Sequence, residues 1–254
     1  MIDGLNVIER RSPNHGERRL PIDMILIHYT DMESAEAALG RLGDPVAEVS
    51  AHYLIDEDGT TYALVDEALR AWHAGAGFWA GETDINSRSI GIELQNPGHG
   101  LGYRDFPPTQ TAVLERILRY LITKYSIPQK HILGHSDVAP GRKRDPGERF
   151  PWQALATAGL GRWPKPRKPD GGPVIAPGKT HALVAATQEA LGVYGYGPIR
   201  VTGTLDAATE AVVTAFQRHF VPECFAPGTE PPGHLGPLTR ARLAGLVDEG
   251  AAKA

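Results

Sequence analysis

The chain has 254 residues, of which 41% are hydrophobic and 22% are charged, with 26 basic against 30 acidic side chains. This composition is ordinary for a globular protein, and the net charge of −4 argues against non-specific nucleic-acid binding. No apolar run approaches the ~18 residues that a membrane helix needs. The single cysteine, Cys224, excludes an internal disulfide and a zinc site with several thiolates, so any metal site must use His, Asp or Glu.

Strand and helix patterns alternate over the first 160 residues. Strands are predicted over 22–29, 51–65 (two strands around a turn at Asp58-Gly59), 89–95 and 131–135. Helices are predicted over 33–42 and 109–126, the second ending before Pro128. Strands that alternate with helices predict an α/β fold with a mixed central β-sheet flanked by helices.

A change in composition divides the chain. Residues 161–180 contain five Pro, four Gly and five basic residues, which predicts a stiff, exposed linker. Beyond it, three amphipathic helices are predicted over 181–196, 206–220 and 237–247, with Asp206 as an N-cap. We therefore expect a domain over 1–160, a linker over 161–180 and a small three-helix domain over 181–254.

Two histidines lie where predicted strands end. His28 closes the apolar run 22–29, and His135 closes 131–135. Strand ends commonly carry ligands, although a single histidine there is more often structural. Pro140, Gly141 and Pro146 favour a loop that returns Asp145 to His135. Two imidazoles and one carboxylate form a three-ligand set that leaves a fourth position for water, as catalytic zinc requires.

Other polar residues allow two interpretations at this point. Glu93 interrupts an apolar strand, so it is either paired structurally or tuned for proton transfer, and its spacing favours neither. Lys143 would place a cation near the predicted metal site, where an oxyanion could develop. His52 and His73 fit a hydrogen-bonded or pocket-lining role better than a ligand role. No chemistry is assigned to the remaining histidines: His15, His99, His131, His181, His219 and His234.

Six stretches in order give the first segment a family resemblance. They are ILIHYT (25–30), SAHYLIDEDGT (50–60), RAWHAG (70–75), NSRSIGIELQNPGHG (86–100), GHSDVAPGRKRDPGERFPW (134–152) and GLGRWP (159–164). With them the segment resembles the type 2 N-acetylmuramoyl-L-alanine amidases, which are zinc enzymes that remove the peptide stem from cell-wall muropeptides.

The resemblance implies a role for each candidate residue. It implies that His28, His135 and Asp145 bind Zn²⁺, that Glu93 is the general acid/base, and that Lys143 stabilises the oxyanion. It also implies that Trp72, His73 and Asn96 shape the substrate pocket, although a core role is at least as common for a residue such as Trp72. Family members of the phage lysozyme type have a Tyr and a Cys where this chain has Ala51 and Asp145, so the carboxylate branch fits better.

The C-terminal segment resembles the three-helix peptidoglycan-binding domains that are often fused to wall hydrolases. Gln188, Leu191 and the stretches 202–220 and 236–243 carry this resemblance. The stretch 221–235 is longer and richer in proline than the usual turn, which weakens the case for a binding groove.

The expected function is hydrolysis of the amide between N-acetylmuramic acid, or its 1,6-anhydro form, and L-alanine. The partner is therefore peptidoglycan or a muropeptide. The alternatives are a non-catalytic receptor for peptidoglycan fragments and a zinc peptidase of the peptide stem. Because residues 1–19 contain no apolar segment of 7–15 residues, we expect a cytoplasmic protein, or a periplasmic one if a leader has been removed.

Overall fold

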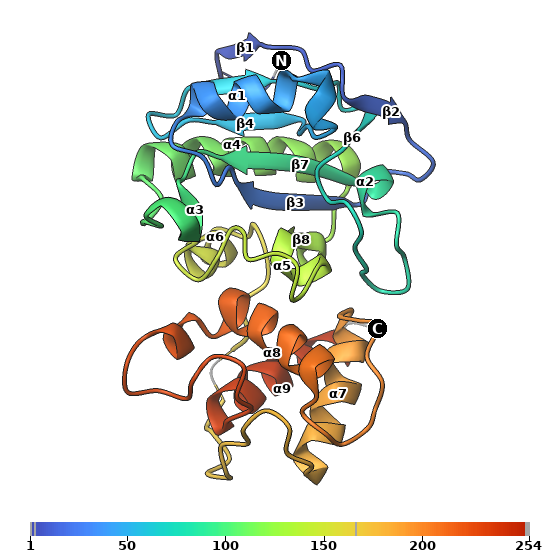
Figure 1. Cartoon of the computed structure of the whole chain (residues 1–254), viewed down its shortest axis with the longest axis vertical. Coiled ribbons are helices and arrows are strands. Elements are labelled where there is room, and N and C mark those ends of the chain that lie inside the picture. Colours follow the sequence, from blue (N-terminus) through green and yellow to red (C-terminus); the bar gives the residue numbers. More distant parts are fainter. Residues whose placement is uncertain (1, 3, 166, 252–254) are drawn as a thin grey trace.

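A six-stranded sheet forms the centre of the N-terminal part of the molecule (Figure 1). The computed structural model describes residue 2, residues 4–165 and residues 167–251. The strands are β1 (Val7–Glu9), β3 (Met24–Tyr29), β4 (Tyr53–Ile55), β5 (Thr61–Ala63), β7 (Ser89–Leu94) and β8 (Ile132–Gly134). Their order is β1-β5-β4-β7-β3-β8, and a separate antiparallel pair joins β2 (His15–Glu17) to β6 (Leu69–Ala71).

Strand directions confirm the predicted mixed sheet. β3 pairs in parallel with β7 on one side and with β8 on the other, and β4 is parallel to β7. The predicted hairpin is present as the antiparallel pair β4 and β5. Because the three central pairings are parallel, the carboxyl ends of β4, β7, β3 and β8 lie at the same edge of the sheet. At that edge His28 of β3 lies directly opposite Glu93 of β7.

Alternation along the strands gives the sheet two different faces. One face carries Ile25 and Ile27 of β3, which pack in one cluster with Leu114 and Ile117 of α4 (Pro108–Tyr125). On β3 the other face carries Met24, Leu26 and His28. Near β4 this second face is covered by α1 (Ala35–Gly43), while Met24 and Leu26 belong to an apolar cluster that continues into the C-terminal part. His28 therefore lies on the face whose apolar cluster continues into the C-terminal part.

Short helices complete the N-terminal part. They are α2 (Ile85–Arg88), α3 (Gly98–Leu101), α5 (His135–Val138) and α6 (Trp152–Thr157), with single 3₁₀ turns at Pro45–Ala47 and Gln129–His131. The strand expected over 131–135 ends one residue earlier, because His135 begins α5. The carboxylate of Asp137 accepts a hydrogen bond from the amide of Gly134 at 2.8 Å and so caps this turn.

The C-terminal part contains the three expected helices, α7 (Ala182–Tyr194), α8 (Ala207–Phe220) and α9 (Pro237–Ala251), with a 3₁₀ turn at Pro222–Phe225. Asp206 caps α8 by accepting a hydrogen bond from the Thr209 amide at 2.8 Å. The domain limits at 160 and 180 remain predictions, and residues 1, 3, 166 and 252–254 within those ranges lie outside the described residues. No helix of the described part is both long and apolar enough to cross a membrane.

The segment expected to be a stiff, exposed linker contacts the C-terminal part at several points, among them Ile175 and Asp170. Ile175 is buried and forms a two-way backbone bridge with Leu235. Asp170 accepts hydrogen bonds from the guanidinium of Arg240 at 2.8 and 2.6 Å. An apolar residue and an acidic residue within the Pro-rich stretch thus provide contacts that composition alone does not reveal.

One apolar core runs between the two parts. It includes Met24 and Trp79 from the N-terminal part together with Tyr196, Phe216 and Leu243 from the C-terminal part. In Figure 1 the C-terminal helices lie beneath the sheet, with α5, α6 and β8 between them and the rest of the N-terminal part. Burial of shared apolar surface therefore stabilises one arrangement of the two parts.

Candidate active site

Three parallel strands bring the candidate residues together. His28 and Glu93 are the penultimate residues of β3 and β7, and His135 directly follows β8. Because these strands are parallel neighbours, the three side chains meet at one edge of the sheet. Asp145 reaches the same place from the loop after α5, where its carbonyl accepts a hydrogen bond from the Ser136 amide at 2.9 Å.

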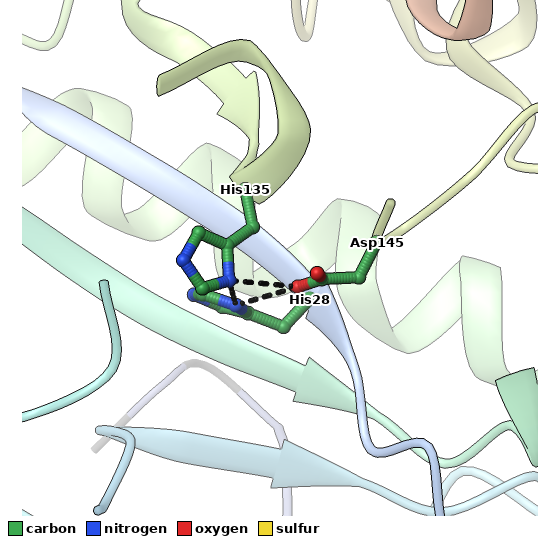
Figure 2. Close-up of side chains that lie close together, drawn as sticks. All are labelled: His28, His135 and Asp145. Atoms are coloured by element: carbon green, nitrogen blue, oxygen red, sulfur yellow. Dashed lines mark hydrogen bonds and ion pairs between the residues drawn. The ribbon is translucent and has the colours of Figure 1, made fainter. Parts of the chain in front are cut away.

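His28, His135 and Asp145 converge on one point (Figure 2). The Nδ1 atoms of the two histidines lie 3.0 Å apart. Oδ2 of Asp145 lies 2.9 Å from Nδ1 of His28 and 3.0 Å from Nδ1 of His135. All three residues are buried, and they are the one group in the described part of the chain whose His, Cys, Asp or Glu atoms are arranged to hold a metal ion.

Hydrogen bonds on the far side of each ring assign the tautomers. Nε2 of His135 lies 2.8 Å from the carbonyl oxygen of Ala74, which can only accept, so Nε2 carries the proton. The Ser89 hydroxyl donates to the carbonyl of Ile85 at 2.6 Å and therefore accepts from Nε2 of His73 at 3.2 Å. Nδ1 of His73 is then an acceptor and receives the Nε2 proton of His28 at 3.1 Å. The inward-facing Nδ1 atoms of His28 and His135 are therefore both unprotonated, and each presents a lone pair.

The protonation states fit a cation between the three groups. Burial, and next the neighbouring His135, lowers the pKa of His28 to about 4, so its ring is neutral near pH 7. Burial alone would raise the pKa of Asp145, but His135 and His28 hold it well below its usual range. Two lone pairs and a carboxylate oxygen thus face one another at about hydrogen-bond distance. A metal ion that prefers N and O donors satisfies all three.

A cavity of about 490 Å³ opens over this cluster. Its lining contains the three clustered residues and also Glu93, Lys143, Trp72 and His73. Of the eight predicted site residues, all but Asn96 therefore line one cavity.

Glu93 occupies an unusual electrostatic position in the cavity. Burial, and next the charge of Asp145, raises the pKa of Glu93 well above its ordinary value, while Lys143 opposes the shift. Its Oε2 atom is buried and has no hydrogen-bond partner among the described residues. One interpretation of Glu93 was a structural pairing with another side chain, and this oxygen has no such partner among the described residues. A carboxyl group with a raised pKa and a free oxygen is suited to proton transfer.

The three residues expected to shape the substrate pocket differ in position. Trp72 is half-buried at the cavity wall, so it is not a core residue. His73 is buried beside His28. Asn96 is fully buried and does not line the cavity: its side-chain amide donates to the carbonyl of Arg104 at 2.8 Å, and its oxygen accepts from the Gly98 amide at 3.1 Å. A substrate contact by Asn96 remains a prediction, and the geometry places this residue in support of the loop that carries α3.

Sequence reasoning assigned no chemistry to His99, which lines the cavity. Its Nδ1 atom lies 2.9 Å from the Tyr29 hydroxyl, and its Nε2 atom lies 3.1 Å from a carboxylate oxygen of Glu148. His99 lies in NPGHG, the end of the stretch 86–100 that carries the family resemblance, and this position was the sequence signal that could have identified it as a site residue. Three arginines that were not singled out also line the cavity: Arg41, Arg142 and Arg144.

Comparison with known proteins decides the family. The N-acetylmuramoyl-L-alanine amidase family matches residues 18–148, and a peptidoglycan binding domain family matches residues 180–223. The chain belongs to the N-acetylmuramoyl-L-alanine amidase family. The amidase is 36% identical over 218 residues to the N-acetylmuramoyl-L-alanine amidase AmiD of Escherichia coli, covering 80% of this chain and 76% of AmiD.

Solved structures of relatives agree with the fold over both parts. A complex of E. coli AmiD with anhydro-N-acetylmuramic acid-L-Ala-D-gamma-Glu-L-Lys superposes with a TM-score of 0.74 at 32% identity, covering 90% of this chain and 89% of AmiD. AmpDh3 from Pseudomonas aeruginosa in complex with anhydromuramic pentapeptide gives a TM-score of 0.75 at 30% identity, covering 94% and 95% of the two chains. An AmpD structure matches over 94% of its own length but only 61% of this chain, with a TM-score of 0.54 at 27% identity.

Proposed function

We propose that this amidase uses Zn²⁺ held by His28, His135 and Asp145 to hydrolyse the amide between the lactyl carbonyl of N-acetylmuramic acid and L-alanine. The observation that carries the proposal is the convergence of two unprotonated Nδ1 atoms and one carboxylate oxygen within about 3 Å of one another. Three protein ligands leave zinc an open position, which is typical of catalytic rather than structural sites. Bound zinc supplies Lewis acidity toward the substrate carbonyl and toward the attacking water.

Glu93 moves the proton in this proposal. Its carboxylate takes a proton from the attacking water and then gives it to the amine of L-alanine as the amide bond breaks. Its place opposite His28 at the end of β7 puts it in the same cavity as the metal ligands. The raised pKa of Glu93 suits the first of these two steps, because a more basic carboxylate is a better proton acceptor from water.

In this proposal Lys143 and the arginines that line the cavity interact with negative charges on the substrate. The Lys143 ammonium stabilises the negative charge that develops on the lactyl carbonyl oxygen during attack. Arg41, Arg142 and Arg144 line the same cavity and are suited to the carboxylates of a muropeptide stem. AmiD and AmpDh3 have each been solved with an anhydromuramyl peptide, which supports a soluble anhydro-muropeptide as the substrate to test first.

The test incubates the zinc-loaded full chain with anhydro-N-acetylmuramyl tripeptide and identifies the products by mass spectrometry. We expect free stem peptide with an L-alanine N-terminus and free anhydro-N-acetylmuramic acid. Cleavage within the stem would identify a peptidase, and binding without cleavage would identify a receptor. Running whole sacculi in parallel shows whether intact wall is also a substrate.

A further inference from the structure

Asp137 connects the metal-ligand helix α5 to the C-terminal helices. It lies two residues after His135 and is fully buried. One of its carboxylate oxygens lies 2.8 Å from the amide of Gly134 and 2.7 Å from Nδ1 of His219. The other accepts a hydrogen bond from the Tyr196 hydroxyl at 2.6 Å. Two of these three partners come from the C-terminal part.

The position of α5, the helix that bears His135, depends on contacts with other segments. α5 has four residues, and a single helical turn has no stability of its own in water. Its N-terminal amide at Gly134 is fixed by Asp137, so the orientation of the peptide just before His135 depends on that carboxylate. A buried carboxylate is stable only when it is hydrogen-bonded, and here Tyr196 and His219 supply most of that bonding.

A second connection links the C-terminal part to the opposite side of the His135 ring. The carbonyl of Ala74 fixes Nε2 of His135, and the loop that follows Ala74 packs on the C-terminal part. In that loop the Ala80 amide donates to the carbonyl of Gly195 at 2.8 Å, and the Trp79 ring meets the Tyr196 ring edge-on at 5.0 Å. The same C-terminal segment therefore supports the loop and α5.

His219 also fits closely between rings of the two parts. It stacks on Trp152 of α6 with ring centroids 3.7 Å apart and on its neighbour Phe220 at 3.8 Å. Trp152 in turn lies against Gly134, where an added Cβ would approach its ring to 3.2 Å. Displacing His219 would thus disturb both the cap of α5 and the packing behind it.

We propose that the C-terminal helices are a structural part of the catalytic centre, in which Tyr196 and His219 act as positioning residues for His135 through Asp137. The proposal rests on the proposed function only in taking His135 as a metal ligand. An AmpD structure is matched over 94% of its own length by only 61% of this chain, so this chain contains additional structure beyond that match.

The test measures Zn²⁺ affinity in the full chain by competition with a chromogenic chelator, and the visible spectrum of the Co²⁺-substituted protein. The variants are Tyr196→Phe, which removes one oxygen and keeps the ring in the core, His219→Ala, and His219→Asn, whose amide can still donate to Asp137. Gln217→Ala is the matched control. Gln217 lies on the same helix and is equally buried, but it bonds Gly233, His234 and Thr239 within the C-terminal part.

Tyr196→Phe and His219→Ala should each weaken Zn²⁺ binding about tenfold and change the Co²⁺ spectrum, as loss of support behind a ligand does. On a soluble anhydro-muropeptide, kcat should fall with little change in KM. His219→Asn should recover part of the loss, and Gln217→Ala should lower Tm and keep parental Zn²⁺ affinity. The inference is overturned if Tyr196→Phe and His219→Ala, shown to be folded by circular dichroism, bind Zn²⁺ like the parent. A parent that binds no Zn²⁺ overturns the proposed function and this inference together.

Discussion

Nε2 of His28 lies 3.1 Å from Nδ1 of His73, and the two rings meet edge-on. This contact makes His73 the acceptor that holds the His28 proton away from the candidate metal site, and the Ser89 hydroxyl holds His73 in the matching tautomer. His73 thus supports the proposed ligand His28 from behind, in addition to lining the cavity. Such partners orient the ligand ring and raise its basicity.

Removing this partner should weaken metal binding. His73→Phe keeps a ring in place but removes the acceptor, so we expect Zn²⁺ affinity to fall about 10- to 100-fold, as measured by chelator competition. Ser89→Ala should act in the same direction by a smaller amount, because it leaves the His28–His73 bond possible. Unchanged affinity in a folded His73→Phe variant would show that the His28 tautomer is set by something else.

Gly91 makes room for the His73 ring. A Cβ at this position would overlap with Cγ of the His73 ring, whereas the backbone conformation of Gly91 is one that any residue can adopt. Gly91→Ala should therefore displace His73, destabilise the protein by about 1–3 kcal/mol and weaken Zn²⁺ binding. Gly40→Ala is the control, since nothing lies within 4 Å of its Cβ position in α1. It should be neutral or stabilising by up to about 1 kcal/mol. Urea unfolding and chelator competition measure both effects, and equal behaviour of the two variants would refute the steric account.

Glu93→Gln should separate proton transfer from metal binding. The amide keeps the shape of the side chain but cannot accept a proton, so kcat should fall about 10²- to 10⁴-fold while Zn²⁺ affinity stays close to parental. Glu36→Gln is the control, because Glu36 is exposed on α1 and, among the residues that the structure describes, forms an ion pair with Arg10 alone. Retained turnover in Glu93→Gln would remove Glu93 from the mechanism. A large loss of Zn²⁺ affinity would instead mean that Glu93 acts on the metal site.

The zinc-free protein should lose stability as the pH falls from about 6.5 toward 4. Burial, and next Arg18, lowers the pKa of His52 to about 3, and burial, and next His135, lowers that of His28 to about 4. The unfolded chain binds protons on both rings near pH 6.5, whereas the native chain does not until the lower values are reached. Unfolding therefore takes up protons in this window, at about 1.4 kcal/mol per pH unit for each ring. The lowered pKa of His73 adds to this slope, and the raised pKa of Glu93 opposes it.

Urea unfolding between pH 5 and 7.5 measures this dependence. The stability that the neutral rings provide is fully present above about pH 6.5 and declines below it. His52→Gln should reduce the slope of the unfolding free energy against pH, between pH 5 and 6, by the contribution of one histidine. This change in slope is independent of any change in stability at pH 7.5. A free energy of unfolding that stays constant across this range in the parent would contradict the burial of neutral histidines.

Periodicity and spacing predicted much of the fold. The apolar run around Ile25 and Ile27 correctly marked a buried strand, and the spacing from His135 to Asp145 allowed the return that the structure shows. These features depend on residues close together in the chain. The role of Glu93 came from resemblance alone and that of Lys143 from its spacing to Asp145 and from resemblance, and both roles remain predictions. The expected compartment also remains a prediction.

Contacts between distant segments were not predictable in this way. His219 was assigned no chemistry, yet it bonds Asp137 across 82 residues of sequence. Its partner lies in another part of the fold, and a histidine on an amphipathic helix gives no sign of what faces it. Ile175 likewise looked like one residue of an exposed linker until its bridge to Leu235 was seen. Such pairs are set by how the two parts dock, which only the three-dimensional structure shows.

The central claim is that the lactyl amide is hydrolysed at the site formed by His28, His135 and Asp145. Hydrolysis of anhydro-N-acetylmuramyl tripeptide by the zinc-loaded chain in ¹⁸O-labelled water tests it most directly. The account predicts one ¹⁸O atom in the lactyl carboxylate of the sugar product and an unlabelled stem peptide with a free L-alanine amine. Label in a peptide carboxylate, or no turnover by protein that holds one Zn²⁺ per chain, would contradict it.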